Sequence, residues 1–197
     1  YIDDFEGSSI KYDIKNWSGW HMASRPQGSG ALTPDKHETN GLSAGFDRAR
    51  LAWYSIDPLF LRNMTNTPRH IRNDVEQRSN HYVREVYERE LFPNKESTYG
   101  ESSTLSVLNL AYYPDERGPY NLDTNLTPEG KLTNPEQRWG GIMRQLTTTD
   151  FESSNIEYIE FWMLDPFIYN PEARGGDMFI NLGEVSEDVL KDGKKFY

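Results

Sequence analysis

The sequence predicts a mostly β protein, a β-sandwich with long loops and one short helix. Short stretches of alternating apolar and polar residues recur along the chain, and turns rich in Gly, Pro, Asp and Asn separate them. Residues 80–91 carry apolar side chains at helical spacing instead. Seven or eight short strands with a single helix are typical of a sandwich rather than of an α/β sheet.

The expected elements follow from this alternation in chain order. Strands are expected at residues 1–7, 10–14, 17–22, 46–54, 104–112, 139–146, 156–164 and 178–182. Residues 24–40 have no periodicity and predict a long exposed loop. Residues 53–58 and 161–166 both end an aromatic strand with Asp-Pro, where the proline forbids further ladder pairing.

The strand at residues 46–54 has a clear polarity. Ala49, Leu51 and Trp53 share one face, whereas Arg48 and Arg50 share the other. We therefore expect a half-buried strand whose arginines face solvent.

The helix predicted over residues 80–91 rests on spacing. Two pairs of opposite charge, one of them Arg84 with Glu88, lie four residues apart, and Pro93 ends the pattern. Residues 186–190 are expected to start one last helical turn.

Composition excludes several classes of protein. The 197 residues carry a net charge of −10, which argues against nucleic acid as the main partner, because such binding depends on basic residues. The sequence has no cysteine, so disulfides and zinc–thiolate sites are excluded. No apolar run exceeds four residues, far short of the roughly 20 that a transmembrane helix needs. The chain starts without Met, and we interpret it as an internal fragment of a longer protein.

Aromatic residues make up 13% of the chain and are expected to form most of the core, because aliphatic residues are few. Trp53 and Trp162 lie in apolar strand ends and are expected in that core. Trp17 and Trp20, beside a glycine and a polar loop, are expected to be partly exposed. They are the candidate residues for stacking on a sugar, with core packing as the favoured alternative.

A cluster of acidic residues near the start is a candidate calcium site. Asp3, Asp4 and Glu6 supply the hard oxygen ligands that Ca²⁺ prefers, and loops would complete the set. The alternative is that Asp4 and Glu6 cap turns by accepting bonds from backbone amides.

Catalytic motifs are not found. The four histidines lack the spacing of a metal site. Glu157 and Glu160 differ in parity, so in a strand they would face opposite sides and could not flank one glycosidic bond. A hydrolase is therefore the weakest interpretation, and we expect a protein that is not an enzyme and requires no cofactor.

Longer strings resemble the SprA/Sov family in the same order across nearly the whole chain. They are WYSIDP (53–58), SNHYVREV (79–86), LFPNK (91–95), LNLAYYP (108–114), RGPYN (117–121), NPEQRWGGIMR (134–144), NIEYIEFW (155–162) and NLGEVSEDVLKDGKKF (181–196). This family comprises giant outer-membrane proteins of the Bacteroidetes that act in type IX protein secretion and gliding motility.

The resemblance implies a role in a β-barrel translocon. Its partners would be the rest of the parent barrel, a PorV-type outer-membrane protein, a periplasmic plug protein and secreted cargo proteins. Charged residues interrupt the candidate strands, so residues 1–197 are expected to form a single soluble domain attached to the barrel, at the cell surface.

A second resemblance concerns the fold. DDFEG (3–7), Trp139-Gly140-Gly141 and IEFW (159–162) are similar to galactose-binding-type jelly rolls, many of which hold a structural calcium. The sequence thus leaves two functions open. The favoured one is a non-catalytic structural and interaction domain of a translocon, and the alternative is a carbohydrate-binding module recognising surface glycan through Trp17 or Trp20.

Overall fold

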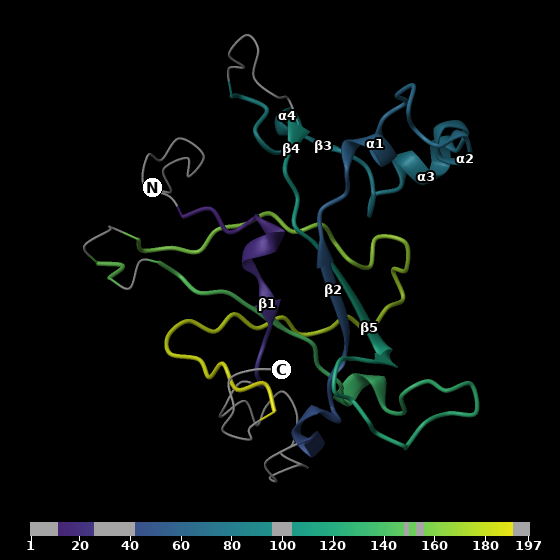
Figure 1. The fold of residues 1–197 in the computed structure, drawn as a ribbon. Coiled ribbons are helices and arrows are strands. Elements are labelled where there is room, and N and C mark those ends of the chain that lie inside the picture. The colour runs from purple at the N-terminus through teal and green to yellow at the C-terminus, as the bar shows by residue number, and fades with distance from the viewer. Residues whose placement is uncertain (1–11, 26–41, 96–103, 148–149, 153–155, 191–197) are drawn as a thin grey trace. The chain divides into compact units, whose positions relative to one another are not determined.

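The computed structural model describes residues 12–25, 42–95, 104–147, 150–152 and 156–190. Over these residues the protein is mostly β, built of small antiparallel strands with a few short helices (Figure 1). The strands pair two by two, as β1 with β6, β2 with β5, and β3 with β4. Among the residues described, no helix has the length and apolar character needed to cross a membrane.

The chain divides into two compact units, each made of three stretches of sequence. Unit 1 comprises Tyr1–Lys15, Tyr54–Asn109 and Thr147–Asp177. Unit 2 comprises Asn16–Trp53, Leu110–Leu146 and Met178–Tyr197. The single domain expected from the sequence stays a prediction.

Unit 2 holds two of the sheets. In the first, β1 (His21–Met22) runs antiparallel to β6 (Ile142–Met143), with His21 opposite Met143. The second pairs β2 (Ala49–Tyr54) with β5 (Asn109–Arg117), and the two strands lie side by side in Figure 1. The β2 strand lies within the predicted stretch 46–54.

The described residues of unit 2 also form three short 3-10 helices. They are η2 (Trp17–Gly19), η3 (Leu42–Gly45) and η4 (Pro135–Gln137). Asn16 caps η2, where its side-chain oxygen accepts a bond from the Ser18 amide at 3.0 Å. Among the described residues of this unit, the buried apolar side chains are two alanines and two leucines: Ala44, Ala49, Leu132 and Leu190.

Unit 1 holds the helices and the third sheet. The helices are α1 (Pro58–Leu61), α2 (Arg69–Asn73), α3 (Val75–Ser79) and α4 (Glu88–Leu91), and the sheet pairs β3 (Val86–Tyr87) with β4 (Thr104–Leu105). Asp57 and Asp74 cap α1 and α3 with side-chain oxygens. The sequence analysis predicted one helix and missed α1 to α3, whose four or five residues are too short to show periodicity.

The helix predicted over residues 80–91 is wrong except for its last turn. Asn80 forms a turn instead, because its side chain accepts a bond from the Tyr82 amide and its carbonyl accepts from Arg84. The expected ion pair of Arg84 with Glu88 does not form, since Arg84 binds Glu90 and Glu88 binds Lys95. Only α4 remains helical.

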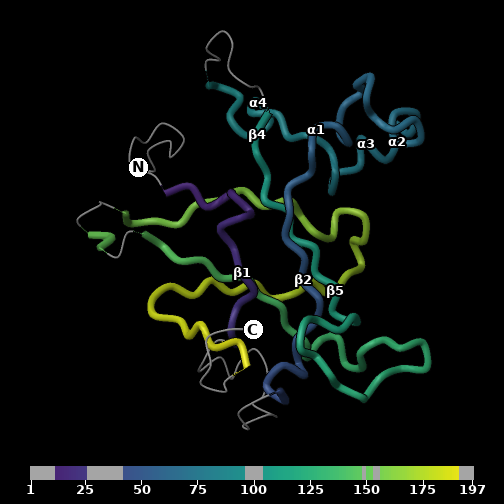
Figure 2. Tube along the Cα trace, viewed as in Figure 1, coloured from purple at the N-terminus to yellow at the C-terminus, as the bar shows by residue number. Residues whose placement is uncertain are grey.

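Two predicted strands are also wrong. Residues 156–164 and 178–182 belong to no strand. In Figure 2 they lie on the lime and yellow-green parts of the trace, which contain no labelled element. Residues 186–190 form no helix and end in a turn. The strands predicted at 1–7 and the first part of 10–14 lie outside the described residues, as does most of the predicted loop at 24–40.

Candidate functional site

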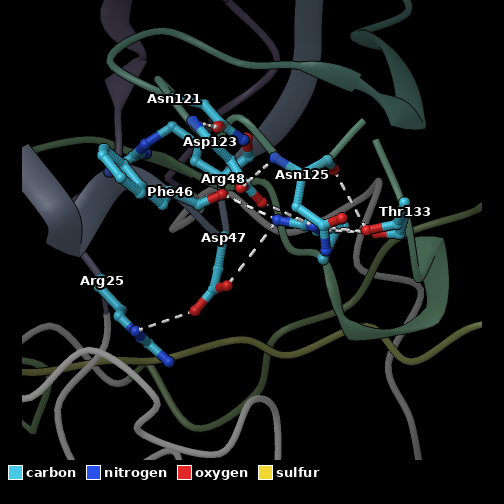
Figure 3. A network of polar contacts seen from close by, with 9 residues as sticks. Arg25, Phe46, Asp47, Arg48, Asn121, Asp123, Asn125 and Thr133 are labelled. Carbon is cyan, nitrogen blue, oxygen red and sulfur yellow. Dashed lines mark hydrogen bonds and ion pairs between the residues drawn. The ribbon is translucent and has the colours of Figure 1, made fainter. Parts of the chain in front are cut away.

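The most deeply buried side chains of unit 2 include charged ones, gathered where η3 leads into β2 (Figure 3). Arg48 is 2% exposed, and Arg25, Asp47 and Asn121 are also buried. The side chain of Arg138, from the residue after η4, is only 6% exposed. This arginine cluster, Arg25, Arg48 and Arg138 with their partners, is the first candidate site.

Backbone pairing fixes Arg48 at the start of β2. Its carbonyl oxygen accepts from the Gly118 amide at 3.1 Å and from the Asn121 side chain at 2.6 Å. A residue larger than glycine does not fit at position 118, because a Cβ there would overlap the Ala49 carbonyl oxygen. The loop after β5 is therefore held directly against the arginine.

The guanidinium of Arg48 is held by neutral groups. Its Nη1 donates to the Ala23 carbonyl at 2.7 Å, and its carbon lies 4.5 Å from the ring centroid of Trp139. Its Nε and Nη2 have no hydrogen-bond partner among the described residues. Burial lowers the pKa of Arg48 to about 10, so the group remains a cation at neutral pH.

Arg138 joins two of the three stretches of unit 2. It donates to the Phe46 carbonyl at 2.9 Å, to the Thr133 carbonyl at 2.9 and 3.0 Å, and to Asp123 Oδ2 at 3.0 Å. All three guanidinium nitrogens of Arg138 donate hydrogen bonds, which a lysine ammonium group cannot reproduce because its geometry differs.

Asp47 lies between two arginines. Its carboxylate is 3.5 Å from Arg25 Nη1 and 3.9 Å from Arg138 Nη1. With Asp123 included, the cluster holds three cations and two anions. Because arginine does not give up its proton in proteins, the arrangement suits the joining of backbone segments rather than acid–base chemistry.

The sequence analysis missed this cluster, and its prediction that Arg48 faces solvent is wrong. Alternation assigned Arg48 and Arg50 to one outer face, yet only Arg50 is exposed, paired with Glu116 at 2.8 Å. Arg48 precedes the first residue of β2, where it bridges to Trp139 on a third stretch of chain. A period-two pattern carries no signal for such a bridge.

The two tryptophans predicted to stack on sugar lie in and directly after η2. Trp17 is 48% exposed, and Trp20 is half-buried with the Arg144 guanidinium 5.8 Å from its ring centroid. One exposed ring is available to a ligand, and sugar binding stays a prediction.

The predicted calcium ligands Asp3, Asp4 and Glu6 lie outside the described residues. Within the described ranges, no group of three or more acidic or histidine side chains is arranged to hold a metal ion. The calcium site stays a prediction.

The second candidate site is the exposed apolar segment, residues 156–164 of unit 1. Six of its side chains are between 44% and 75% exposed: Tyr158, Ile159, Phe161, Trp162, Met163 and Leu164. The prediction that Trp162 belongs to the core is therefore wrong. Trp53 is half-buried, and no aromatic side chain is among the buried hydrophobic residues in the described part of the chain.

A similar exposure recurs in unit 2, where residues 178–182 leave Met178, Phe179, Ile180 and Leu182 at least half exposed. Contiguous apolar exposure of this kind marks interaction surfaces in soluble proteins. The rings that the sequence analysis expected between two sheets thus lie on the outside.

Comparison of the chain with models of protein families and with curated proteins found no match.

Proposed function

We propose that this chain is a non-catalytic structural and interaction domain of an outer-membrane protein translocon of the type IX kind. Its proposed fold is a jelly-roll β-sandwich, and its proposed location is the cell surface. The observation that carries the proposal is the exposed apolar segment. An acidic, polar chain that leaves its most apolar stretch outside needs another surface to cover it.

The arginine cluster supports the structural half of this proposal. Its guanidinium groups bind carbonyl oxygens of Ala23, Phe46 and Thr133, which come from two of the three stretches of unit 2. Groups committed in this way stabilise a scaffold. The small antiparallel strands are compatible with a sandwich.

The translocon half rests on the resemblance of the long strings to the SprA/Sov family. The proposed partners are the rest of the parent barrel, a PorV-type protein, the plug protein and secreted cargo. The segment 155–162 is itself one of the resembling strings, so the proposed contact surface and the resemblance coincide in sequence.

The proposal is tested in the intact parent protein. Deleting Tyr1–Tyr197, or replacing Tyr158 and Phe161 together by serine, should abolish export of type IX cargo while the parent remains in the outer membrane. Val75→Ser is the matched control, because Val75 is 65% exposed on α3, outside the segment. Normal export after the deletion would overturn the proposal.

A second function is favoured by one observation, the exposed ring of Trp17 beside Trp20. A carbohydrate-binding module would use this ring as a stacking platform for surface glycan. Titration of the 197-residue chain against a glycan panel tests it, with Trp17→Ala and Trp20→Ala as the binding-deficient variants. Absence of binding across the panel would eliminate this function.

A further inference from the structure

The backbone of the exposed apolar segment pairs with no strand in the part of the chain that the structure describes. The Ile156 amide donates to the Phe151 carbonyl at 2.9 Å, and the next backbone hydrogen bond along the chain starts at Ile168. Residues 157–164 form no backbone hydrogen bond with any described residue. A stretch of this length whose backbone donors and acceptors bind no described residue offers the template that an added β-strand uses.

Contacts within unit 1 hold the segment in place. The rings of Trp162 and Phe92 meet edge to face, with centroids 6.3 Å apart. Beyond the segment, the Tyr82 hydroxyl donates to the Pro166 carbonyl at 2.8 Å, and the Tyr169 hydroxyl accepts from the His81 amide at 2.9 Å. Because these anchors limit the motion of the segment, pairing with a partner costs less conformational entropy.

The side chains define what can cover the segment. In a strand, Tyr158, Trp162 and Leu164 would share one face with Glu160, and Ile159, Phe161 and Met163 would share the other with Glu157. Both faces are therefore apolar with one carboxylate each. This pattern is typical of a strand that neighbours cover on both sides.

The charge of the segment selects the partner. Glu157 and Glu160 are exposed and form no ion pair with the described residues, and the segment contains no basic residue. A second copy of the chain would bring like charges together, which opposes pairing. A strand with lysine or arginine opposite each glutamate is complementary.

We propose that residues 156–164 are a docking strand for an extended, basic segment of another polypeptide, joined by β-augmentation. The partner strand carries two basic residues three positions apart, matching Glu157 and Glu160, with apolar residues between and around them. This inference rests on the proposed interaction function and specifies the chemistry of the partner.

A synthetic peptide of alternating valine and threonine with two lysines three positions apart tests the inference on the 197-residue chain. Fluorescence anisotropy should show it binding about tenfold more tightly than the same peptide with two glutamates. Hydrogen exchange should show protection of alternate amides within residues 157–164 in the complex, because one added strand binds one edge of the segment.

Charge reversal supplies the decisive variant. Glu157→Lys with Glu160→Lys should reverse the preference between the two peptides, whereas Glu172→Lys with Asp177→Lys, the same change outside the segment, should leave it intact. Equal affinity for both peptides, protection confined to other residues, or dimerisation through this segment at about 0.15 M salt in place of peptide binding would overturn the inference.

The two proposals fail separately. Peptide binding with normal export after deletion of Tyr1–Tyr197 would sustain the docking strand and overturn the translocon role. Loss of export after the deletion, with no peptide binding, would sustain the translocon role and overturn the docking strand.

Discussion

At position 48 an arginine is as deeply buried as Leu132 and Leu190, the buried leucines in the described part of unit 2. Burying a cation costs free energy, and the Ala23 carbonyl and the ring face of Trp139 offset this cost at the guanidinium of Arg48. The side chain of Asn121 also binds the backbone carbonyl of Arg48 and fixes its position. At this scale the protein uses polar contacts where most proteins of its size use aliphatic packing. Its stability should therefore depend on the donor geometry of single arginines.

Arg138→Lys tests this dependence. Lysine keeps the charge but cannot reach two carbonyls and Asp123 with one fork, so we expect the free energy of unfolding to fall by about 2–4 kcal/mol. Urea denaturation of the 197-residue chain measures the loss. Arg50→Lys is the control, since its exposed pair with Glu116 is screened by solvent and should contribute little to stability. Equal losses in both variants would contradict the structural role of Arg138.

Among the elements, α4 shows how local interactions prevail over periodicity. Its one turn depends on Glu90, which accepts from the Tyr87 amide at 2.9 Å and from both Arg84 nitrogens at 2.7 and 2.9 Å. The bond from Arg84, with that from the Tyr87 amide, lowers the pKa of Glu90 to about 2. The helix start is thus a carboxylate clamp rather than the amphipathic stretch that the spacing predicted.

The clamp has a definite pH dependence. Because the folded pKa of Glu90 lies below its ordinary value of 4.5, its stabilisation is fully present above pH 4.5 and is lost as the pH falls toward 2. The group is largely exposed, so we expect no more than about 1 kcal/mol. Glu90→Gln should flatten the stability curve in this range, as measured by urea denaturation, whereas Glu172→Gln should not. Identical curves for wild type and Glu90→Gln would refute the clamp.

The two Asp-Pro strings illustrate what a short sequence determines at this scale. Asp57 accepts from the Leu59 amide at 2.8 Å, and Asp165 accepts from the Phe167 amide at the same distance. The same dipeptide thus forms the same Asx turn in two settings. The preceding residues differ, because 49–54 pair with β5 whereas 156–164 pair with no described strand.

For the whole molecule, the net charge of −10 and the exposed apolar segment act in opposition. Apolar exposure favours association of copies, and like charge opposes it. At about 0.15 M salt the Debye length of about 8 Å exceeds the spacing of paired strands, so repulsion prevails. The balance should therefore depend on salt.

We expect the chain to be monomeric at about 0.15 M salt and to self-associate at about 1 M, where the Debye length is about 3 Å. Sedimentation velocity measures this. Ile159→Lys should keep the chain monomeric in both conditions, and Leu110→Lys, an exposed apolar position on β5, should behave as wild type. A dimer at low salt, or no change with salt, would contradict this balance of forces.

The sequence by itself determined the β-rich class, the strand at 49–54 within the predicted 46–54, and the turns at Asp-Pro, because alternation and turn chemistry are local. Only the tertiary structure decided that Arg48 is buried, that residues 80–87 are not helical and that Trp162 is exposed. The first two outcomes depend on partners distant in sequence, which are Trp139 and Asn121 for Arg48, and Leu105 and Thr104 for Val86 and Tyr87. The third follows because no described strand pairs with the stretch that contains Trp162. A local pattern specifies which face a side chain takes, but the chain's long-range pairing decides whether that face is covered.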